Sequence, residues 1–170
     1  MQAALRVLVV RHAEAEELSH TGGGARTDAE RALTKDGIAH MRKGVRGLRT
    51  LVDDIAVIHS SPLKRAVQTA DLLAEGYPHA KTIQHARLSP GFDPEKLLDW
   101  LAQQREVVAL VGHEPDLSQW IGYLTTHTAS SIVQMKKGSV CCLEMPEAGM
   151  AGEARIRWLL TLKQLAKLDS

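Results

Sequence analysis

Short runs of apolar residues alternate along the chain with segments of helical periodicity. Three of these runs are rich in β-branched residues and lie at 5–10 (LRVLVV), 55–58 (IAVI) and 107–111 (VVALV). Continuous apolar runs of this length are typical of strands that are covered on both faces, as in a parallel sheet. A weaker run at 82–85 indicates one more strand.

Helical patterns fill much of the chain between these runs, with apolar residues at steps of three and four. We expect five helices. The first is capped by Thr34 and runs toward Val52, and the second begins at Ser61-Pro62. The third spans 94–104, the fourth begins at Pro115-Asp116, and the fifth spans 162–168. The Ser61-Pro62 pair predicts a sharp helix start, because a hydroxyl caps a helix and proline fits its first position. In the helix over 94–104, Leu97, Leu98 and Leu101 are expected to face inward.

The C-terminal part of the chain follows a different pattern. Residues 139–145 and 154–160 predict two strands around a glycine-containing loop, 146–153, which favours an antiparallel pair at a sheet edge. Together with the strand–helix alternation, this pattern predicts a three-layer α/β/α fold, in which helices flank a mostly parallel sheet with an antiparallel C-terminal edge. We find no internal repeat or linker, so we expect a single domain over residues 1–170.

One segment, residues 13–32, fits neither the strand nor the helix pattern. It is rich in charged residues and contains Gly22-Gly23-Gly24. We expect it to be either a mobile surface loop or a functional lid beside the end of the first strand.

Composition narrows the function mainly by exclusion. The chain has 170 residues, and its 21 basic and 20 acidic residues leave a net charge of +1. This balance excludes the strongly basic footprint of a dedicated nucleic-acid binder, and no apolar run reaches the roughly 18 residues of a membrane span. The N-terminus lacks the basic region of a signal peptide, so we expect a cytoplasmic protein. The adjacent Cys141 and Cys142 are expected to be reduced core thiols.

Polar residues follow each of the three main apolar runs. Arg11-His12 follow the first, His59-Ser60-Ser61 the second and His113-Glu114 the third, and Arg65 lies one turn into the helix after the second. The carboxyl ends of parallel strands meet at one edge of a sheet, and ligands bind outside that edge in open α/β sheets. We therefore expect Arg11, His12, Arg65 and His113 to converge.

Two arginines and two histidines suit a dianionic phosphoryl group. Arginine matches phosphate bidentately, a helix N-terminus adds amide donors, and one imidazole attacks phosphorus while the other holds its oxygens. Ser61 is a further candidate donor to the phosphate. Zinc would require three or four His, Cys or carboxylate ligands and would be repelled by the arginines, so we expect neither a metal nor a cofactor. The missing P-loop pattern excludes nucleotide hydrolysis by that route.

The motifs at these positions resemble those of the histidine phosphatase superfamily, the phosphoglycerate mutase-like phosphatases. Residues 11–13 (RHA) are similar to its R-H-G motif, residues 60–70 (SSPLKRAVQTA) to its S-P-x-x-R-A-x-Q-T-A block, and residues 111–113 (VGH) to its third block. Residues 28–37, with Asp28, Arg31, Leu33, Thr34 and Gly37 at the matching positions, resemble a segment of the compact SixA-type phosphohistidine phosphatases. The resemblance covers residues 5–145. It departs from the family pattern at Ala13, which replaces a glycine, and at Ala32, which replaces a proline.

The resemblance implies a role for each residue of the predicted cluster. His12 corresponds to the phosphorylated nucleophile, and Arg11, Arg65 and His113 correspond to the rest of the phosphate pocket. The SixA-type relatives lack the cap domain of larger members, which implies an open pocket that suits a phosphoprotein. Phosphate, sulfate and vanadate are the expected pocket ligands.

The general acid is left open. The acidic motif that follows the second block in larger relatives is missing from residues 86–94. Three candidates are Glu114 directly after His113, Glu14 in the first loop and Asp93, and a fourth possibility is that no acid exists. An alkyl phosphate ester needs a proton donor for its alkoxide, whereas the imidazole of phosphohistidine leaves without a strong acid. A missing acid therefore favours phosphohistidine as the substrate.

We accordingly predict a metal-independent phosphatase that acts through a covalent phosphohistidine intermediate on His12. The favoured substrate is a protein phosphohistidine, and neither nucleic acid nor a membrane is expected as a partner. Two alternatives stay open. One is a phosphomonoesterase for a small molecule such as a sugar or nucleotide phosphate. The other is a non-catalytic phosphate-binding module.

Overall fold

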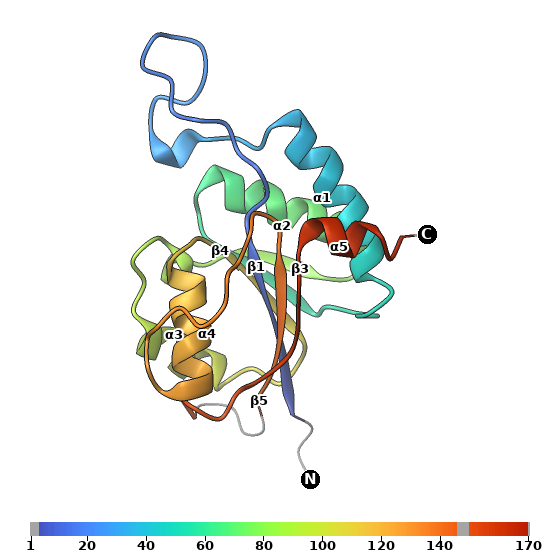
Figure 1. Ribbon diagram of the computed structural model, residues 1–170, viewed down its shortest axis with the longest axis vertical. Helices are drawn as coiled ribbons and strands as arrows, with labels where there is room; N and C mark the ends of the chain where they lie inside the picture. The colour runs from blue at the N-terminus through green and yellow to red at the C-terminus, as the bar shows by residue number, and fades with distance from the viewer. Residues whose placement is uncertain (1–3, 146–149, 170) are drawn as a thin grey trace.

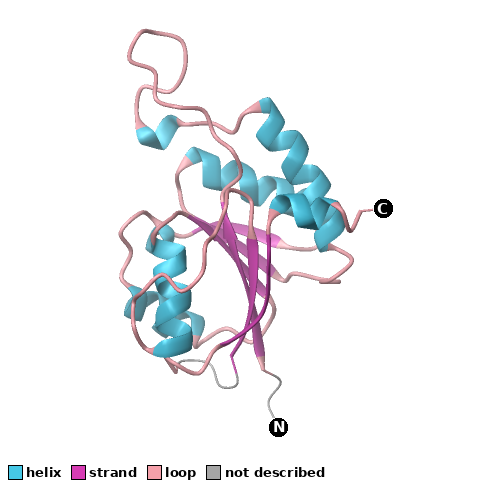
Figure 2. Ribbon diagram, in the orientation of Figure 1, coloured by secondary structure: helices cyan, strands magenta, loops and turns pink. Residues whose placement is uncertain are grey.

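A six-stranded mixed sheet forms the centre of the computed structural model, which describes residues 4–145 and 150–169 (Figure 1, Figure 2). The strands are β1 (Leu5–Arg11), β2 (Val57–Ser60), β3 (Lys81–Gln84), β4 (Val108–Gly112), β5 (Val140–Met145) and β6 (Arg155–Leu160), in the order β3-β2-β4-β1-β5-β6. The first four strands pair in parallel, and β5 and β6 are antiparallel to their neighbours. The expected mostly parallel sheet with an antiparallel C-terminal edge is confirmed.

The strands send alternate side chains into two separate cores. In β1, Leu8 and Val10 belong to one core, and Val7 and Val9 belong to the other. All four side chains are fully buried. This double burial explains why the strand is apolar throughout rather than at every second position.

Helices cover both faces of the sheet (Figure 2). One face carries α1 (Lys35–Leu48), α2 (Lys64–Gly76) and α5 (Leu162–Ala166), and the other carries α3 (Pro94–Leu101) and α4 (Asp116–Thr126). The cap predicted at Thr34 is confirmed, because its hydroxyl accepts a hydrogen bond from the amide of Gly37 at 2.9 Å. Leu97, Leu98 and Leu101 are buried as expected.

The prediction that a helix begins at Ser61-Pro62 is wrong. α2 begins at Lys64, and Leu63 is its N-cap. The amide of Ser61 instead donates to the carbonyl of Val111 at 2.9 Å, which ties Ser61 to the end of β4. Proline also favours an extended conformation in the residue before it. Ser61 therefore extends the sheet edge and does not cap the helix.

Other predicted boundaries differ by a few residues. The second strand, Val57–Ser60, lies two residues beyond the run at 55–58, and the fully buried Ile55 precedes it. α1 ends at Leu48 and α3 at Leu101, earlier than Val52 and Gln104. The weak run at 82–85 forms β3, whose residues are all exposed at the edge of the sheet.

The two cysteines lie in β5, next to β6 at the antiparallel edge. Cys141 and Cys142 are free and buried, and they belong to different cores. Burial raises the pKa of the Cys141 thiol to about 12. The expected reduced core thiols are confirmed. Of the predicted loop over 146–153, residues 146–149 lie outside the described residues.

The segment between β1 and α1 projects from the rest of the fold (Figure 1). It contains the 3-10 helix η1 (Asp28–Glu30), and isolated bridges join Ala15 to Leu33 and Leu18 to Ala25. Gly22, Gly23 and Gly24 all have positive φ angles, a conformation that glycine adopts without strain. The base of the segment is therefore tied to the fold, and its tip is a glycine turn.

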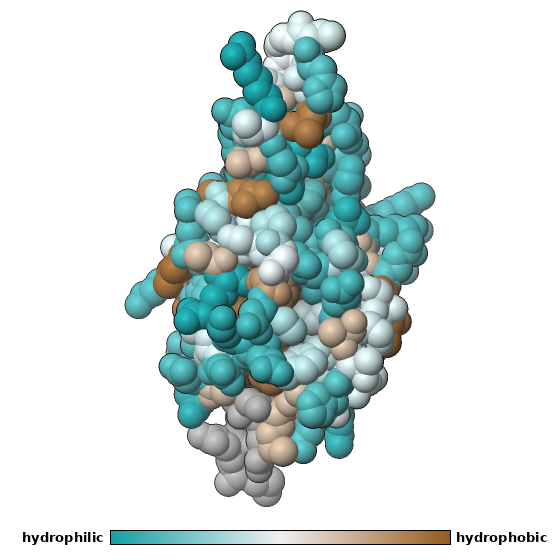
Figure 3. All heavy atoms as spheres, turned by 90° about the vertical axis from the view of Figure 1, so that its left-hand side faces the viewer, coloured by the Kyte–Doolittle hydropathy of each residue, from teal (hydrophilic) through white to brown (hydrophobic). Residues whose placement is uncertain are grey.

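The face on the left of Figure 1 is largely hydrophilic, with hydrophobic residues scattered across it (Figure 3). Among residues 4–145 and 150–169, no helix has the length and apolar character needed to cross a membrane.

Candidate active site

The ends of β1, β2 and β4 place the predicted arginines and histidines at one edge of the sheet. β4 lies between β2 and β1, and Arg11 is in register with Gly112. The pairing continues past the strand, because the amide of His12 donates to the carbonyl of Gly112 at 3.1 Å. His12, Arg65 and His113 are buried and Arg11 is half-buried. The structure thus brings together residues that are far apart in the sequence.

His12 presents an unprotonated ring nitrogen to the site. Its Nδ1 lies 2.7 Å from the carbonyl oxygen of Ala13. Because a carbonyl oxygen only accepts hydrogen bonds, Nδ1 carries the proton, and Nε2 of the neutral ring keeps a lone pair. Nε of Arg65 donates a hydrogen bond to this Nε2 at 3.3 Å. The lone pair of His12 is therefore directed at the guanidinium group of Arg65.

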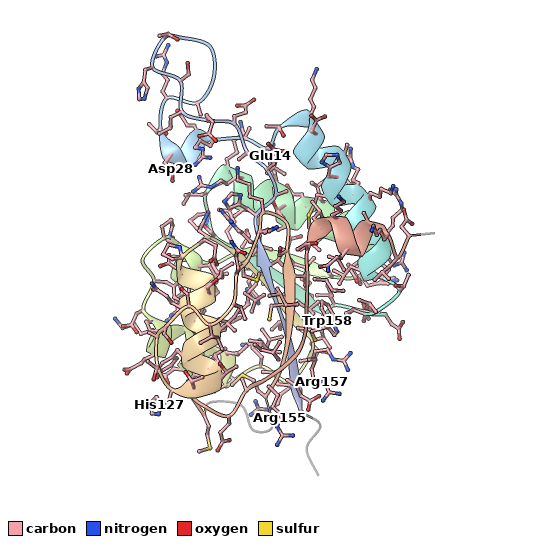
Figure 4. All side chains as sticks on the ribbon, in the orientation of Figure 1. Glu14, Asp28, His127, Arg155, Arg157 and Trp158 are labelled. Carbon is pink, nitrogen blue, oxygen red and sulfur yellow. The ribbon has the colours of Figure 1, made fainter. Side chains whose placement is uncertain are left out.

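Arg65 is held by an acidic residue that the sequence did not assign to the site. Its Nη1 donates to the backbone carbonyl of Asp28 at 2.7 Å, and its Nη2 donates to the Asp28 carboxylate at 3.0 Å. The Arg65 side chain is 6% exposed and that of Asp28 is 52% exposed. Asp28 lies on the projecting segment (Figure 4), so this segment contacts the site through it. In the sequence, Asp28 is marked only by the resemblance of residues 28–37 to a segment of the SixA-type phosphatases.

Arg11 is fixed by the backbone of the loop before β5. Its Nη1 donates to the carbonyl of Met135 at 2.8 Å. The amide of Gly138 donates to the carbonyls of Arg11 and His12, at 3.2 and 3.0 Å. Nε of Arg11 is buried and has no hydrogen-bond partner among the described residues. A buried guanidinium donor of this kind is suited to an oxyanion.

His113 supplies the second imidazole of the site, and Ser61 lies in contact with it. The rings of His113 and His12 lie with their centroids 5.3 Å apart. Nε2 of His113 is 2.7 Å from the hydroxyl of Ser61, which is fully buried. Ser61 therefore contacts His113, and its role as a phosphate donor stays a prediction. In the described part of the chain, the buried Nδ1 of His113 has no partner.

The site disfavours protons on both imidazoles. Burial and the nearby charges of Arg65, Arg11 and Arg31 together lower the pKa of His12 to about 4. Burial, and after it the charge of Arg65, lowers the pKa of His113 to about 3. Both rings are therefore neutral near pH 7, while the guanidinium groups beside them stay charged. Such a site attracts an anion and offers it a neutral imidazole.

The three candidate acids lie in different places. Glu114 accepts hydrogen bonds from the amide and the hydroxyl of Ser118 in α4. Asp93 caps α3 by accepting from two of its backbone amides, and Glu14 is exposed in the loop after His12. Capping of helix amides accounts for Glu114 and Asp93 without any chemistry. The role of each residue as a general acid stays a prediction.

Two residues of the second sequence block hold the first loop against α2. Thr69 is fully buried, and its hydroxyl accepts from the amide of Ala13 at 3.0 Å and donates to the carbonyl of Arg65 at 2.8 Å. The side chain of Gln68 accepts from the amide of Leu33 at 2.8 Å. Thr69 therefore couples the helix that carries Arg65 to the turn after His12.

His59 has a packing role at the end of β2. Its ring centroid lies 4.6 Å from that of Trp100 and 5.5 Å from that of His85.

Within residues 4–145 and 150–169, no group of three or more histidine, cysteine or carboxylate side chains is arranged to hold a metal ion. The chemistry that the site residues offer is the binding of an oxyanion beside the lone pair of His12.

Known proteins resemble this chain both in sequence and in fold. The family model of the histidine phosphatase superfamily (branch 1) matches residues 7–90. An uncharacterised protein of Picosynechococcus sp. is 31% identical over 136 residues, which cover 76% of this chain and 78% of that protein.

Two solved structures share the fold over nearly their whole length. One is the protein histidine phosphatase SixA complexed with tungstate, with a TM-score of 0.78 and 19% identity, over 95% of this chain and 99% of that one. The other is the putative phosphohistidine phosphatase SixA from Agrobacterium tumefaciens, with a TM-score of 0.74 and 18% identity, over the same shares of the two chains.

Proposed function

The chain belongs to the histidine phosphatase superfamily and is a phosphatase, and we propose that it hydrolyses protein phosphohistidine through a covalent intermediate on His12. The observation that carries this proposal is the tautomer of His12. The hydrogen bond from Nδ1 to the carbonyl of Ala13 leaves the lone pair of Nε2 directed at Arg65. A nucleophile and a phosphate-binding group therefore lie in contact before any substrate binds.

The proposed reaction has two steps at phosphorus. In the first, Nε2 of His12 attacks the phosphoryl group, the N–P bond of the substrate breaks, and the substrate ring, which is protonated on its other nitrogen, leaves with the electron pair as neutral imidazole. In the second, water attacks the phosphorus of phosphorylated His12, the Nε2–P bond breaks and returns its electron pair to Nε2, and the water proton passes to an oxygen of the phosphate that leaves. Arg11 and Arg65 hold the oxygens in both steps, because the charge on them must be stabilised in each transition state.

The histidine pKa values support this division of roles. His12 is a nucleophile only when neutral, and burial with three neighbouring arginines keeps its pKa near 4. A bound dianion adds negative charge beside His113 and raises its pKa, so His113 is able to take up a proton in the complex. The guanidinium groups remain charged throughout the reaction.

The leaving group favours phosphohistidine over phosphate esters. Asp93 caps α3, and Glu114 accepts hydrogen bonds from Ser118 in the first turn of α4. A general acid contributes about 10²–10⁴-fold to reactions that need one. Phosphohistidine with a protonated ring releases a neutral imidazole without that help. The fold shared with a protein histidine phosphatase that binds tungstate, an oxyanion, also supports the proposal.

The test is to label the phosphoenzyme and compare substrates. A peptide with one chemically phosphorylated, radiolabelled histidine is mixed with the protein and quenched. We expect label on the protein that survives alkali and is lost in acid, and no label on His12→Ala. The matched control is His79→Ala, which removes an exposed histidine.

The same protein is then assayed with the phosphohistidine peptide, a phosphoserine peptide and a sugar phosphate. We expect the phosphohistidine peptide to be hydrolysed about 100-fold faster than the others, with inhibition by vanadate and no effect of a chelator. Equal rates on all three substrates would overturn the phosphohistidine proposal. Label on His12→Ala would overturn the assignment of the nucleophile.

A further inference from the structure

A second concave site lies beside the active site, between α1, the loop before β5 and α5. It is a cavity of about 590 Å³. Its lining residues include four lysines, which are Lys43, Lys136, Lys137 and Lys163. Glu14 is the one carboxylate among its described lining residues. We call this site the lysine cavity.

The charge of the lysine cavity contrasts with that of the whole chain. Four lysines face one glutamate there, although the chain as a whole has a net charge of +1. All four lysines are exposed, and in the part of the chain that the structure describes no ion pair involves them. Ammonium groups gathered at one site repel one another, and an anionic partner relieves this repulsion.

The floor of the lysine cavity is firmly packed and partly apolar. Leu162 contributes to the lining and packs against two glycines. A Cβ atom added at Gly44 would clash with one methyl group of Leu162, and one added at Gly138 would lie 2.7 Å from the other methyl group. The glycines therefore let Leu162 approach α1 and the loop before β5 closely. Lysine stems beside this floor extend its apolar surface.

The lysine cavity lies close to the backbone that carries two of the active-site residues. Lys136 and Lys137 directly precede Gly138, whose amide donates to the carbonyls of Arg11 and His12. Glu14 follows His12 by two positions in the sequence and lies beside α1 at the top of the sheet (Figure 4). The segment that carries Lys136 and Lys137 is therefore bonded to the backbone of Arg11 and His12.

We propose that the lysine cavity binds an acidic segment of the phosphoprotein substrate. This inference rests on the proposed function, because it concerns how that substrate is recognised. The lysines come from three separate segments of the chain, so a run of carboxylates contacts them better than a single small anion does. Each exposed ion pair contributes little alone, and the recognition depends on several acting together.

The test uses two phosphohistidine peptides that differ only in four neighbouring positions, which are all glutamate in one and all glutamine in the other. We expect kcat/KM at low salt to be about tenfold higher for the glutamate peptide, because its KM is lower. This preference should shrink as added salt screens the charges. In Lys43→Glu/Lys163→Glu the preference disappears while kcat stays the same. These lysines lie on α1 and α5, away from the groups assigned to the phosphoryl group.

The matched control is Lys81→Glu/Arg105→Glu. It changes the net charge by the same amount at exposed positions, Lys81 at the start of β3 and Arg105 before β4, at the ends of these strands opposite to the active site. This control is expected to keep the glutamate preference. A wild-type protein without the preference, or a Lys43→Glu/Lys163→Glu protein that retains it, would overturn the proposed docking site.

A binding measurement separates this inference from the proposed function. Fluorescence anisotropy of the labelled, unphosphorylated glutamate peptide requires no turnover. Binding to the wild type that is lost in Lys43→Glu/Lys163→Glu supports the docking site, even if neither phosphopeptide is hydrolysed and the proposed function fails. Binding of inorganic tripolyphosphate without binding of the peptide would mean a small-anion site and would overturn the inference.

Discussion

The carboxylate of Asp28 lies 3.0 Å from Nη2 of Arg65, although the two residues belong to separate parts of the fold. Asp28 is in η1 of the projecting segment, and Arg65 is in the first turn of α2. The Asp28 carbonyl accepts a second hydrogen bond from the same guanidinium group. The projecting segment thus orients Arg65, whose Nε contacts His12.

Asp28→Asn is expected to lower kcat by about tenfold, because a misplaced group near the reaction costs rate even without any loss of binding. Asp28 is half exposed, so the melting temperature should change little. The measurement is kcat with phosphohistidine peptide, together with thermal unfolding. Arg31→Gln is the control, because Arg31 pairs with Oδ1 of Asp28, whereas Arg65 pairs with Oδ2. A kcat equal to that of the wild type would contradict the positioning role of Asp28.

His12 and His113 are expected to stay neutral over a pH range in which ordinary histidines titrate. Burial lowers their pKa values to about 4 and about 3. Histidine NMR signals should therefore show no titration of these two rings between pH 5 and 8. A midpoint near 6.5 for either ring would contradict the site electrostatics.

The same shifts make stability depend on pH. The unfolded chain binds protons at these histidines as the pH falls below about 6.5, whereas the folded protein binds them only near the lowered pKa values. The free energy of unfolding should therefore be greatest above about pH 6.5 and fall as the pH drops toward 4. Urea unfolding at a series of pH values measures this loss. Vanadate should make this loss of unfolding free energy smaller above pH 5, because a bound anion raises both histidine pKa values.

Glu114→Gln is expected to retain phosphohistidine hydrolysis within about threefold, because a neutral imidazole leaves without a strong acid. Glutamine still offers an oxygen to the amide of Ser118, which the carboxylate of Glu114 accepts at 3.0 Å. Steady-state rates on the phosphohistidine peptide measure this. A loss of 100-fold or more would identify Glu114 as a required acid.

Thr69→Val is expected to lower the free energy of unfolding by roughly 1–3 kcal/mol, because it leaves the buried amide of Ala13 without its partner. The substitution keeps the volume of the side chain but removes a hydroxyl that makes two hydrogen bonds. Urea unfolding measures the loss. Thr69→Ser, which keeps the hydroxyl, is expected to unfold closer to the wild type. Equal stability of Thr69→Val and the wild type would show that these bonds are dispensable.

Local sequence signals predicted most elements but were weaker at element boundaries. Continuous apolar runs predicted β1 and β4 because both faces of these strands are buried. The start of α2 could not be predicted from Ser61-Pro62, because a long-range bond to Val111 decides the conformation of Ser61. A capping pattern can be read from neighbouring residues, whereas the hydrogen bond that replaces it joins Ser61 to a residue of β4.

The sequence by itself determined the strand–helix alternation and the placement of Arg11, His12 and His113 at the ends of strands. These features follow from apolar periodicity and from the rule that parallel strands deliver their ends to one edge. Only the three-dimensional structure decided which nitrogen of His12 is unprotonated, that Asp28 holds Arg65, and that four lysines from three segments line one cavity. The first depends on where the backbone places the neighbouring carbonyl of Ala13, and the other two depend on contacts between segments whose spacing in the sequence carries no periodic signal.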